Sequence, residues 1–165
     1  MPSAVRKTLL VGLGAAACLV GLPLSRAAAA TATTTFSVTA NVVTTCSITA
    51  TNLNFGNYSG VQLDGTATLN ATCSTGTPYT IGLNAGTGAG ATVNSRKMTG
   101  PAASLLNYSL FRDAAHSSNW GNTTDRQSGT GNGAVQPFTV FGRIPASQFV
   151  QAGAYSDTIT VTLTF

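Results

Sequence analysis

The sequence predicts an all-β protein built as a β-sandwich, and three observations lead to this prediction. Every strongly periodic segment alternates apolar and polar residues, which is the pattern of half-buried strands. Segments rich in Gly, Asn, Ser and Thr separate these strands, as expected for turns. No amphipathic helix is found, and the one long apolar stretch that suits a helix lies near the N-terminus. Many short strands separated by turns favour two packed sheets.

Residues 1–30 are predicted to be a secretory signal peptide. Two basic residues precede an apolar run from Thr8 to Leu24, and Ala27–Ala30 provide a small-residue cleavage site. Cleavage is therefore expected before Thr31. The alternative is a lipoprotein signal at Cys18, but the apolar run continues past that cysteine.

Residues 31–45 are predicted to form a strand with two alternative places. Apolar side chains alternate with polar ones, and the segment has no charge and no glycine, which suits a solvated tail poorly. It either forms the first strand of its own domain or is donated to a neighbouring subunit by strand addition. The apolar residues of this face are Phe36, Val38, Ala40 and Val42.

The domain proper is expected over residues 46–165. Before the final stretch of the chain, period-2 alternation predicts five strands, at 46–50, 66–73, 79–83, 106–110 and 138–144. The turn-rich segments between them include Gly82–Gly90 and Ser117–Gly133, which are expected to be surface loops.

The last stretch, Tyr155–Phe165, alternates without a break. Ile159, Val161, Leu163 and Phe165 share one face, and threonines occupy the other. Such a strand at a sheet edge leaves backbone groups and an apolar face uncovered, and natural proteins usually protect such edges. Another chain is therefore expected to cover this edge.

Cys46 and Cys73 remain after the predicted cleavage. An even number of cysteines in an oxidising compartment favours a disulfide between them. The chain-entropy model gives a bridge at this spacing a stabilisation of about 3–4 kcal/mol. The alternative is a pair of free, buried thiols. A bridge would join the first two core strands and leave residues 31–45 outside the closed loop.

Charge excludes some classes of partner. Three of the eight basic residues lie in the predicted signal peptide, which leaves a net charge of about +1 instead of +4. No basic patch is present, so neither a nucleic-acid partner nor a polybasic membrane contact is expected.

No catalytic, cofactor or metal site is predicted. The chain has no Glu and a single histidine, His116, so the titratable groups needed for catalysis are scarce. The spacing Asp113-x-x-His116 resembles a metal pair, but it lacks a third ligand. An enzyme is therefore not expected.

Four other residues carry individual expectations. Trp120 is either a buried anchor or a platform that stacks on a sugar. Tyr58 and Tyr155 are expected to pack with their hydroxyls on backbone groups. Arg143 is expected to be a solvated charge at a strand edge.

A set of ordered motifs spans nearly all of the expected mature chain. They are Cys46-Ser-Ile48, Leu53-Asn-Phe-Gly-Asn-Tyr58, Cys73, Arg96-Lys-Met98, Leu106-Asn-Tyr-Ser-Leu-Phe-Arg-Asp113, Trp120-Gly121, Phe138-Thr-Val-Phe-Gly-Arg-Ile144 and Gly153-Ala-Tyr-Ser-Asp-Thr158. Together they resemble the spore coat protein U domain family, which includes the subunits of archaic, Csu-type chaperone–usher pili.

The resemblance implies an immunoglobulin-like β-sandwich that lacks its final strand and is completed by donor-strand complementation. A periplasmic chaperone first fills the gap, and the N-terminal strand of the next subunit replaces it during export through an outer-membrane usher. Carried onto this chain, the donor strand is about 33–43. The acceptor groove is lined partly by Ile159, Val161, Leu163 and Phe165, and Cys46 and Cys73 match the family's disulfide.

The expected function is that of a structural subunit of a secreted surface pilus that serves adhesion and biofilm formation. Its expected partners are copies of itself or other pilins, the chaperone and the usher, and it would pass from the periplasm to the cell surface. One domain with a donor-like tail fits a shaft subunit better than a tip adhesin. The alternatives are a self-contained carbohydrate-binding β-sandwich that uses Trp120, or a self-associating coat protein.

Overall fold

The computed structural model describes residues 28–165. Cys18 and all but the last three residues of the predicted signal peptide therefore lie outside the described residues. The chain divides into a unit that ends at Ala40 and a compact unit from Asn41 to Phe165. Residues 28–45 contain no helix and no strand. The strand expected at Phe36–Val42 therefore has no place in either sheet of this structure.

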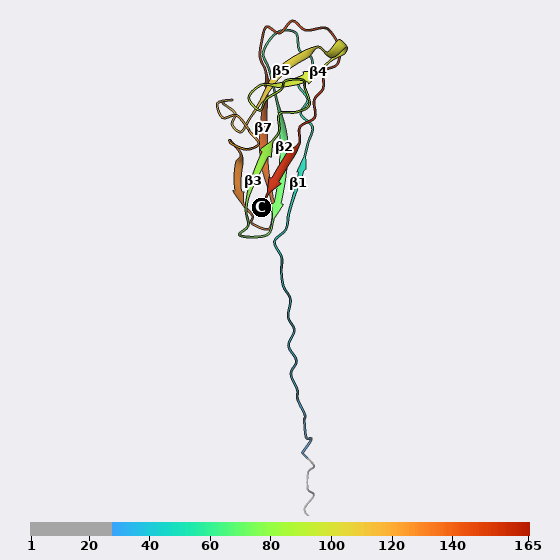
Figure 1. Ribbon diagram of the computed structural model, residues 1–165. Helices are drawn as coiled ribbons and strands as arrows, with labels where there is room; N and C mark the ends of the chain where they lie inside the picture. Colours follow the sequence, from blue (N-terminus) through green and yellow to red (C-terminus); the bar gives the residue numbers. More distant parts are fainter. Residues whose placement is uncertain (1–27) are drawn as a thin grey trace, which may run out of the picture. The chain divides into compact units, whose positions relative to one another are not determined.

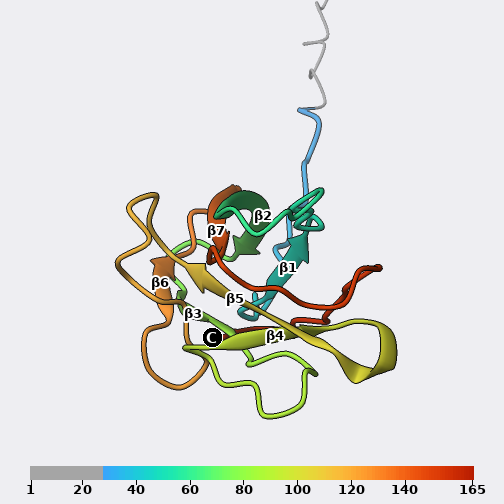
Figure 2. The ribbon, with the colours of Figure 1, turned by 90° about the horizontal axis from the view of Figure 1, so that it is seen from above.

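The compact unit is a sandwich of a five-stranded and a three-stranded sheet (Figures 1 and 2). The order is β1-β2-β7-β5-β4 in the first sheet and β6-β3-β8 in the second. All pairings are antiparallel. The strands are β1 (Cys46–Ala50), β2 (Leu63–Cys73), β3 (Pro78–Leu83), β4 (Arg96–Thr99), β5 (Leu105–Phe111), β6 (Gln127–Thr130), β7 (Val135–Ile144) and β8 (Val161–Thr164).

Strands β2 and β7 form the centre of the larger sheet. They pair continuously from Leu63 opposite Ile144 to Thr72 opposite Val135. Alternate side chains of β2 are buried, as the period-2 pattern requires. The buried side chains of β2, β3, β5 and β7 form one apolar core with Trp120.

A pair of glycines shapes the middle of this sheet. Gly65 and Gly142 lie directly opposite each other on β2 and β7. A Cβ atom at Gly142 would lie 2.8 Å from side-chain atoms of both Leu53 and Phe55. The absence of side chains here lets the segment after β1 pack closely on the sheet.

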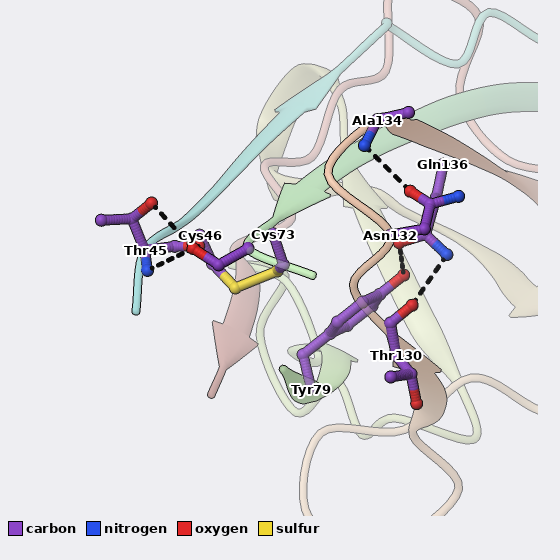
Figure 3. Close-up of a disulfide and its surroundings, with 9 residues drawn as sticks. Thr45, Cys46, Cys73, Tyr79, Thr130, Asn132, Ala134 and Gln136 are labelled. Atoms are coloured by element: carbon purple, nitrogen blue, oxygen red, sulfur yellow. Dashed lines mark hydrogen bonds between the residues drawn. A yellow bond between two sulfur atoms is a disulfide. The ribbon is translucent and has the colours of Figure 1, made fainter. Parts of the chain in front are cut away.

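The disulfide prediction agrees with the structure. Cys46 and Cys73 are joined and face each other as paired residues of β1 and β2 (Figure 3). The pairing extends one step further, because the Ser74 N–H donates to the Thr45 carbonyl (2.9 Å) and the Thr45 N–H donates to Ser74 Oγ (3.0 Å).

Some expected elements differ from those observed. Strands β4 and β6 were not expected, and β8 is shorter than the predicted strand 155–165. In 155–160 only Ser156 forms a bridge, with Thr99, although burial still alternates along the segment. Over 28–165 the sole helical element is the 3₁₀ turn Pro101–Ala103, and nothing described there is a helix long and apolar enough to cross a membrane.

Candidate functional site

The smaller sheet has an open edge at β8. This strand pairs with β3 through four residue pairs, from Leu83 opposite Val161 to Thr80 opposite Thr164. On its other side, no strand of residues 28–165 pairs with it. Strand β1 is likewise an edge strand of the larger sheet and lies close to β8. The two sheets are therefore both unpaired at neighbouring edges.

A cavity of about 590 Å³ opens between the sheets near these edges. The larger sheet contributes Leu69, Leu110 and Val140 to its wall, and the smaller sheet contributes Leu83 and Val161. Leu69, Leu83, Leu110 and Val140 belong to the buried core of the sandwich. The cavity therefore reaches the core, and its apolar walls come from both sheets.

A second cavity, of about 650 Å³, extends this space towards the loops. Leu53, Phe55, Met98 and Tyr155 line both cavities, so the two lie next to each other. The loop that follows β7 closes the far side of the second cavity and includes the exposed side chain of Phe149.

The two tyrosines near this loop behave as expected. The Tyr58 hydroxyl donates to the Pro145 carbonyl (2.7 Å) and accepts from the Gln148 N–H (3.0 Å). The Tyr155 hydroxyl donates to the Gln151 carbonyl (2.6 Å). Both side chains tie loop backbone to the wall of the second cavity.

The structure brings together only part of the predicted acceptor groove. Ile159 and Val161 line the first cavity. Leu163 is half-buried and packs against the core, whereas Phe165 is 59% exposed. The predicted donor residues are all exposed, with exposed fractions of 85% for Phe36, 83% for Val38 and 90% for Val42, and Ala40 is also exposed. Their entry into a groove stays a prediction.

The role of the buried Arg96 could not be predicted from the sequence. The Arg96 side chain is fully buried and donates to the carbonyls of Asn84 (2.9 Å), Val93 (2.7 Å), Leu83 (3.1 Å) and Trp120 (2.7 Å). Burial lowers its pKa to about 10, so it remains protonated at neutral pH. One cation thus fixes three stretches of loop backbone.

Tyr108 provides a polar point on the cavity wall. Its buried hydroxyl donates to Asp157 Oδ2 (2.7 Å). Burial, followed by this hydrogen bond, raises the tyrosine pKa, so the hydroxyl stays a donor at physiological pH. The bond links β5 of the larger sheet to the segment that leads into β8.

The structure corrects the expectation for Arg143 and decides between the two alternatives for Trp120. Arg143 is partly exposed but lies on the central strand β7 and is paired. Its Nε and Nη2 donate to the two Asp64 oxygens (2.7 and 2.8 Å), and Nη2 contacts His116 Nδ1 (3.1 Å). Trp120 is 1% exposed, with Nε1–H donating to the Ile81 carbonyl (2.9 Å), so it is a buried anchor and unavailable for stacking on a sugar.

Asp113 and His116 lie in a turn that the Asp113 side chain stabilises. The Asp113 carboxylate accepts from the Ser117 N–H (3.0 Å), the Ser117 hydroxyl (2.8 Å) and the Ser118 N–H (2.6 Å). These bonds, above all that from the Ser117 backbone, lower its pKa to about 2. His116 instead packs between Phe111 and Phe141. Among residues 28–165, no three His, Cys, Asp or Glu side chains gather as a metal site would require.

Comparisons with known proteins agree with this architecture. The Spore Coat Protein U domain model matches residues 32–162. Protein U of Myxococcus xanthus is 38% identical over 181 residues, which cover 96% of this chain and 98% of that protein.

Two solved structures are similar to the fold. The crystal structure of the CsuC–CsuE chaperone–tip adhesion subunit pre-assembly complex, from archaic chaperone–usher Csu pili of Acinetobacter baumannii, matches with a TM-score of 0.59 and 27% identity. The match covers 75% of this chain and only 40% of that one. The E. coli Hda pilus minor tip subunit HdaB matches at a TM-score of 0.39 and 18% identity, covering 71% and 79%, which is too distant to carry an argument.

The first of these similarities agrees with the predicted fold class, an all-β, immunoglobulin-like sandwich. The family model and the relative together cover nearly the whole expected mature chain. The chain therefore belongs to the spore coat protein U domain family.

Proposed function

We propose that this protein is a structural subunit of a surface pilus that polymerises by donating residues 31–45 of one copy to the groove of the next. The observation that carries the proposal is the cavity that opens beside the unpaired edges of β1 and β8. Core side chains of both sheets line it, and a strand inserted there would cover them while pairing with a free sheet edge.

Residues 31–45 suit this role chemically. Their four alternating apolar side chains stand two residues apart, which places them about 6.8 Å from one another along an extended strand. Each would enter the cavity from the same face, while the backbone forms hydrogen bonds that do not depend on sequence. Chaperone–pilin complementation is an established example of this mode of binding.

The proposal implies partners and a route. An exposed apolar groove promotes aggregation, so a periplasmic chaperone would occupy it until a donor strand arrives, and an outer-membrane usher would export the assembled subunits. The relative in the Csu pilus is found with its chaperone in a pre-assembly complex, which supports this step. Surface adhesion and biofilm formation would be the functions of the finished fibre.

The test compares assembly of the mature chain with that of a chain lacking residues 31–44, each expressed with the periplasmic chaperone. We expect the full chain to form multimers that resist unheated detergent and collapse on heating, and the truncated chain to remain bound to the chaperone. A stable full-length monomer without chaperone would show that the proposal is wrong.

A matched pair of variants sharpens the test. Phe36→Asp with Val38→Asp places charges on the apolar face of the proposed donor, and Ser37→Asp with Thr39→Asp places the same charges on the opposite face. Only the first pair is expected to abolish multimers, because only those charges would enter the groove. Equal loss in both pairs would exclude groove filling as the mechanism.

A coat subunit remains the second candidate, because the chain is 38% identical to Protein U and matches a family described by a spore coat protein. Electron microscopy of the purified multimers separates the two candidates: thin fibres support the pilus, and extended layers support the coat.

A further inference from the structure

The segment Ser156–Thr160 forms the rim of the groove just before β8. Its first residue bridges to Thr99, and the strand begins only at Val161. Between these points one backbone–backbone hydrogen bond joins the segment to the residues after β3, from the Asn84 N–H to the Thr160 carbonyl (3.1 Å). The rim nevertheless lines the cavity through Ser156, Asp157 and Ile159. Something other than a β-ladder must therefore hold it in place.

Side chains supply most of this support. Asp157 Oδ1 accepts from the Thr87 N–H (2.7 Å), the Thr87 hydroxyl (2.8 Å) and its neighbour, the Thr158 N–H (2.7 Å). Asn84 Oδ1 accepts from the Thr160 N–H (2.9 Å) and from the Gly86 N–H (3.1 Å). The rim is thus fastened at both ends to the loop that follows β3.

The fit between this loop and Asp157 is close. Gly86 has a φ of +84°, and a Cβ atom there would lie 2.0 Å from Asp157 Oδ2. Only glycine leaves space for the carboxylate and adopts this backbone conformation without strain. The sequence of the loop is therefore adapted to receive Asp157.

Two further contacts join this network to the larger sheet and to the buried Arg96. Tyr108, on β5 of the opposite sheet, donates its hydroxyl to Asp157 Oδ2 across the cavity wall (2.7 Å). Arg96 holds the carbonyls of Leu83 and Asn84, so the loop that carries the rim is itself fixed by a buried cation. Loop, rim and larger sheet are joined through Asp157.

We propose that Asp157, supported by Tyr108 and Asn84, is a positioning residue that keeps the β8 rim in place while the chaperone leaves the groove and a donor strand enters, so that the incoming strand meets a preformed edge. This role rests on the proposed function of strand acceptance. Any part of the groove that is unfilled during this exchange gains free energy by closing on itself, and strand binding must first reverse that closure. Once a strand has entered, its own backbone hydrogen bonds hold the rim and the side-chain network matters less.

The test follows strand uptake by the full mature chain carrying Val38→Asp, which prevents it from donating its own segment. It is purified with its chaperone and mixed with a labelled synthetic peptide of residues 31–45. We expect Asp157→Asn and Tyr108→Phe each to slow uptake about ten-fold or more, the effect of losing a hydrogen bond to a charged group. The melting temperature of the peptide-filled product is expected to change little.

Tyr79→Phe is the matched control. Its hydroxyl is also on a buried ring and donates to Gln136 (3.0 Å; Figure 3). Tyr79 does not line the cavity. We expect uptake at the unaltered rate. If Asp157→Asn yields no soluble complex, Thr87→Val provides the same comparison, because it removes only the hydroxyl bond to Asp157.

The outcomes are distinct. Slow uptake in the variants with a normal melting temperature of the filled product supports the role. Equal uptake rates in variants and parent overturn it and leave the proposed function intact. Slow uptake together with a marked fall in the melting temperature of the filled product does the same, because the substitution would then destabilise the whole domain. Failure of the parent protein to take up any peptide overturns the proposed function, and this role with it.

Discussion

The two sheets of the sandwich are completed in different ways. In the larger sheet, β7 pairs with β2 along its entire length and with β5 on its other side, and the disulfide joins β2 to β1. In the smaller sheet, β8 pairs over four residues on one side only, and the preceding rim depends on Asp157 and Asn84. In the larger sheet, which we call the complete half, backbone ladders hold all strands together as far as its own edge at β1. In the smaller sheet, the open half, polar side chains stand in for a missing ladder.

The strongest way to break the open half is to charge its groove. Val161→Asp places a carboxylate on the apolar cavity wall, where it would lose hydration without gaining a partner. We expect detergent-resistant multimers to disappear. Thr162→Asp is the control, because the neighbouring side chain is exposed on the other face of β8. Normal assembly by Val161→Asp would show that this wall does not receive a strand.

The polar support of the open half can be tested at Arg96. Arg96→Met leaves the carbonyls that the guanidinium binds without donors, and we expect a loss of about 3–5 kcal/mol in the free energy of unfolding. Urea denaturation of the chaperone-free, strand-filled protein measures it. Lys97→Met removes a neighbouring cation and is expected to cost less than about 1 kcal/mol. Similar losses in both variants would contradict a special role for Arg96.

The covalent link of the complete half is expected to contribute almost as much. Replacing Cys46 and Cys73 together by serine should lower the free energy of unfolding by about 3–4 kcal/mol, because the unfolded chain regains the freedom of the closed loop. Urea denaturation with and without reductant checks the value. Reductant should destabilise the parent and leave the double variant unchanged, and any reductant effect on the variant would point to another cause.

The smallest expected effect lies on the outer face of the larger sheet. The hydrogen bonds from Arg143 lower the pKa of Asp64 below its ordinary value. Their stabilising contribution is therefore complete above the ordinary carboxyl pKa, near pH 4, and is lost as the pH falls through the lowered value. Because Asp64 is partly exposed, Asp64→Asn should remove only about 0.5–1 kcal/mol of acid-dependent stability.

Acid titration of unfolding with both proteins measures this difference. Asp113 also has a lowered pKa and is unchanged in the variant, so part of the acid dependence should persist. Identical pH profiles would show that the ion pair contributes nothing.

The sequence predicted the complete half better than the open one. Period-2 runs located β1, β2, β5 and β7 of the larger sheet but only β3 and part of β8 in the smaller one, because burial on one face leaves a hydrophobic pattern. Strands β4 and β6 consist of Arg-Lys-Met-Thr and Gln-Ser-Gly-Thr, which carry no such pattern and depend on neighbours for pairing.

At the site, alternation predicted that Ile159 and Val161 share an apolar face, and both line the first cavity, but it could not reveal which part of 155–165 has a ladder partner. The Arg96 and Asp157 networks were also out of reach. A buried cation satisfied by backbone carbonyls leaves no periodic trace, since its partners are set by loop conformation and not by residue type.

The position of the disulfide also bears on how a fibre carries load. Cys46 is the first residue of β1, and β1 is an edge strand of only five residues. A pulling force applied through the residues before Cys46 would peel such a strand from the sheet one hydrogen bond at a time. The covalent bond to Cys73 instead passes the force directly into β2, whose long pairing with β7 would have to slide as a whole. In a pilus built as proposed, the subunit would resist tension at its central strands rather than at its weakest edge.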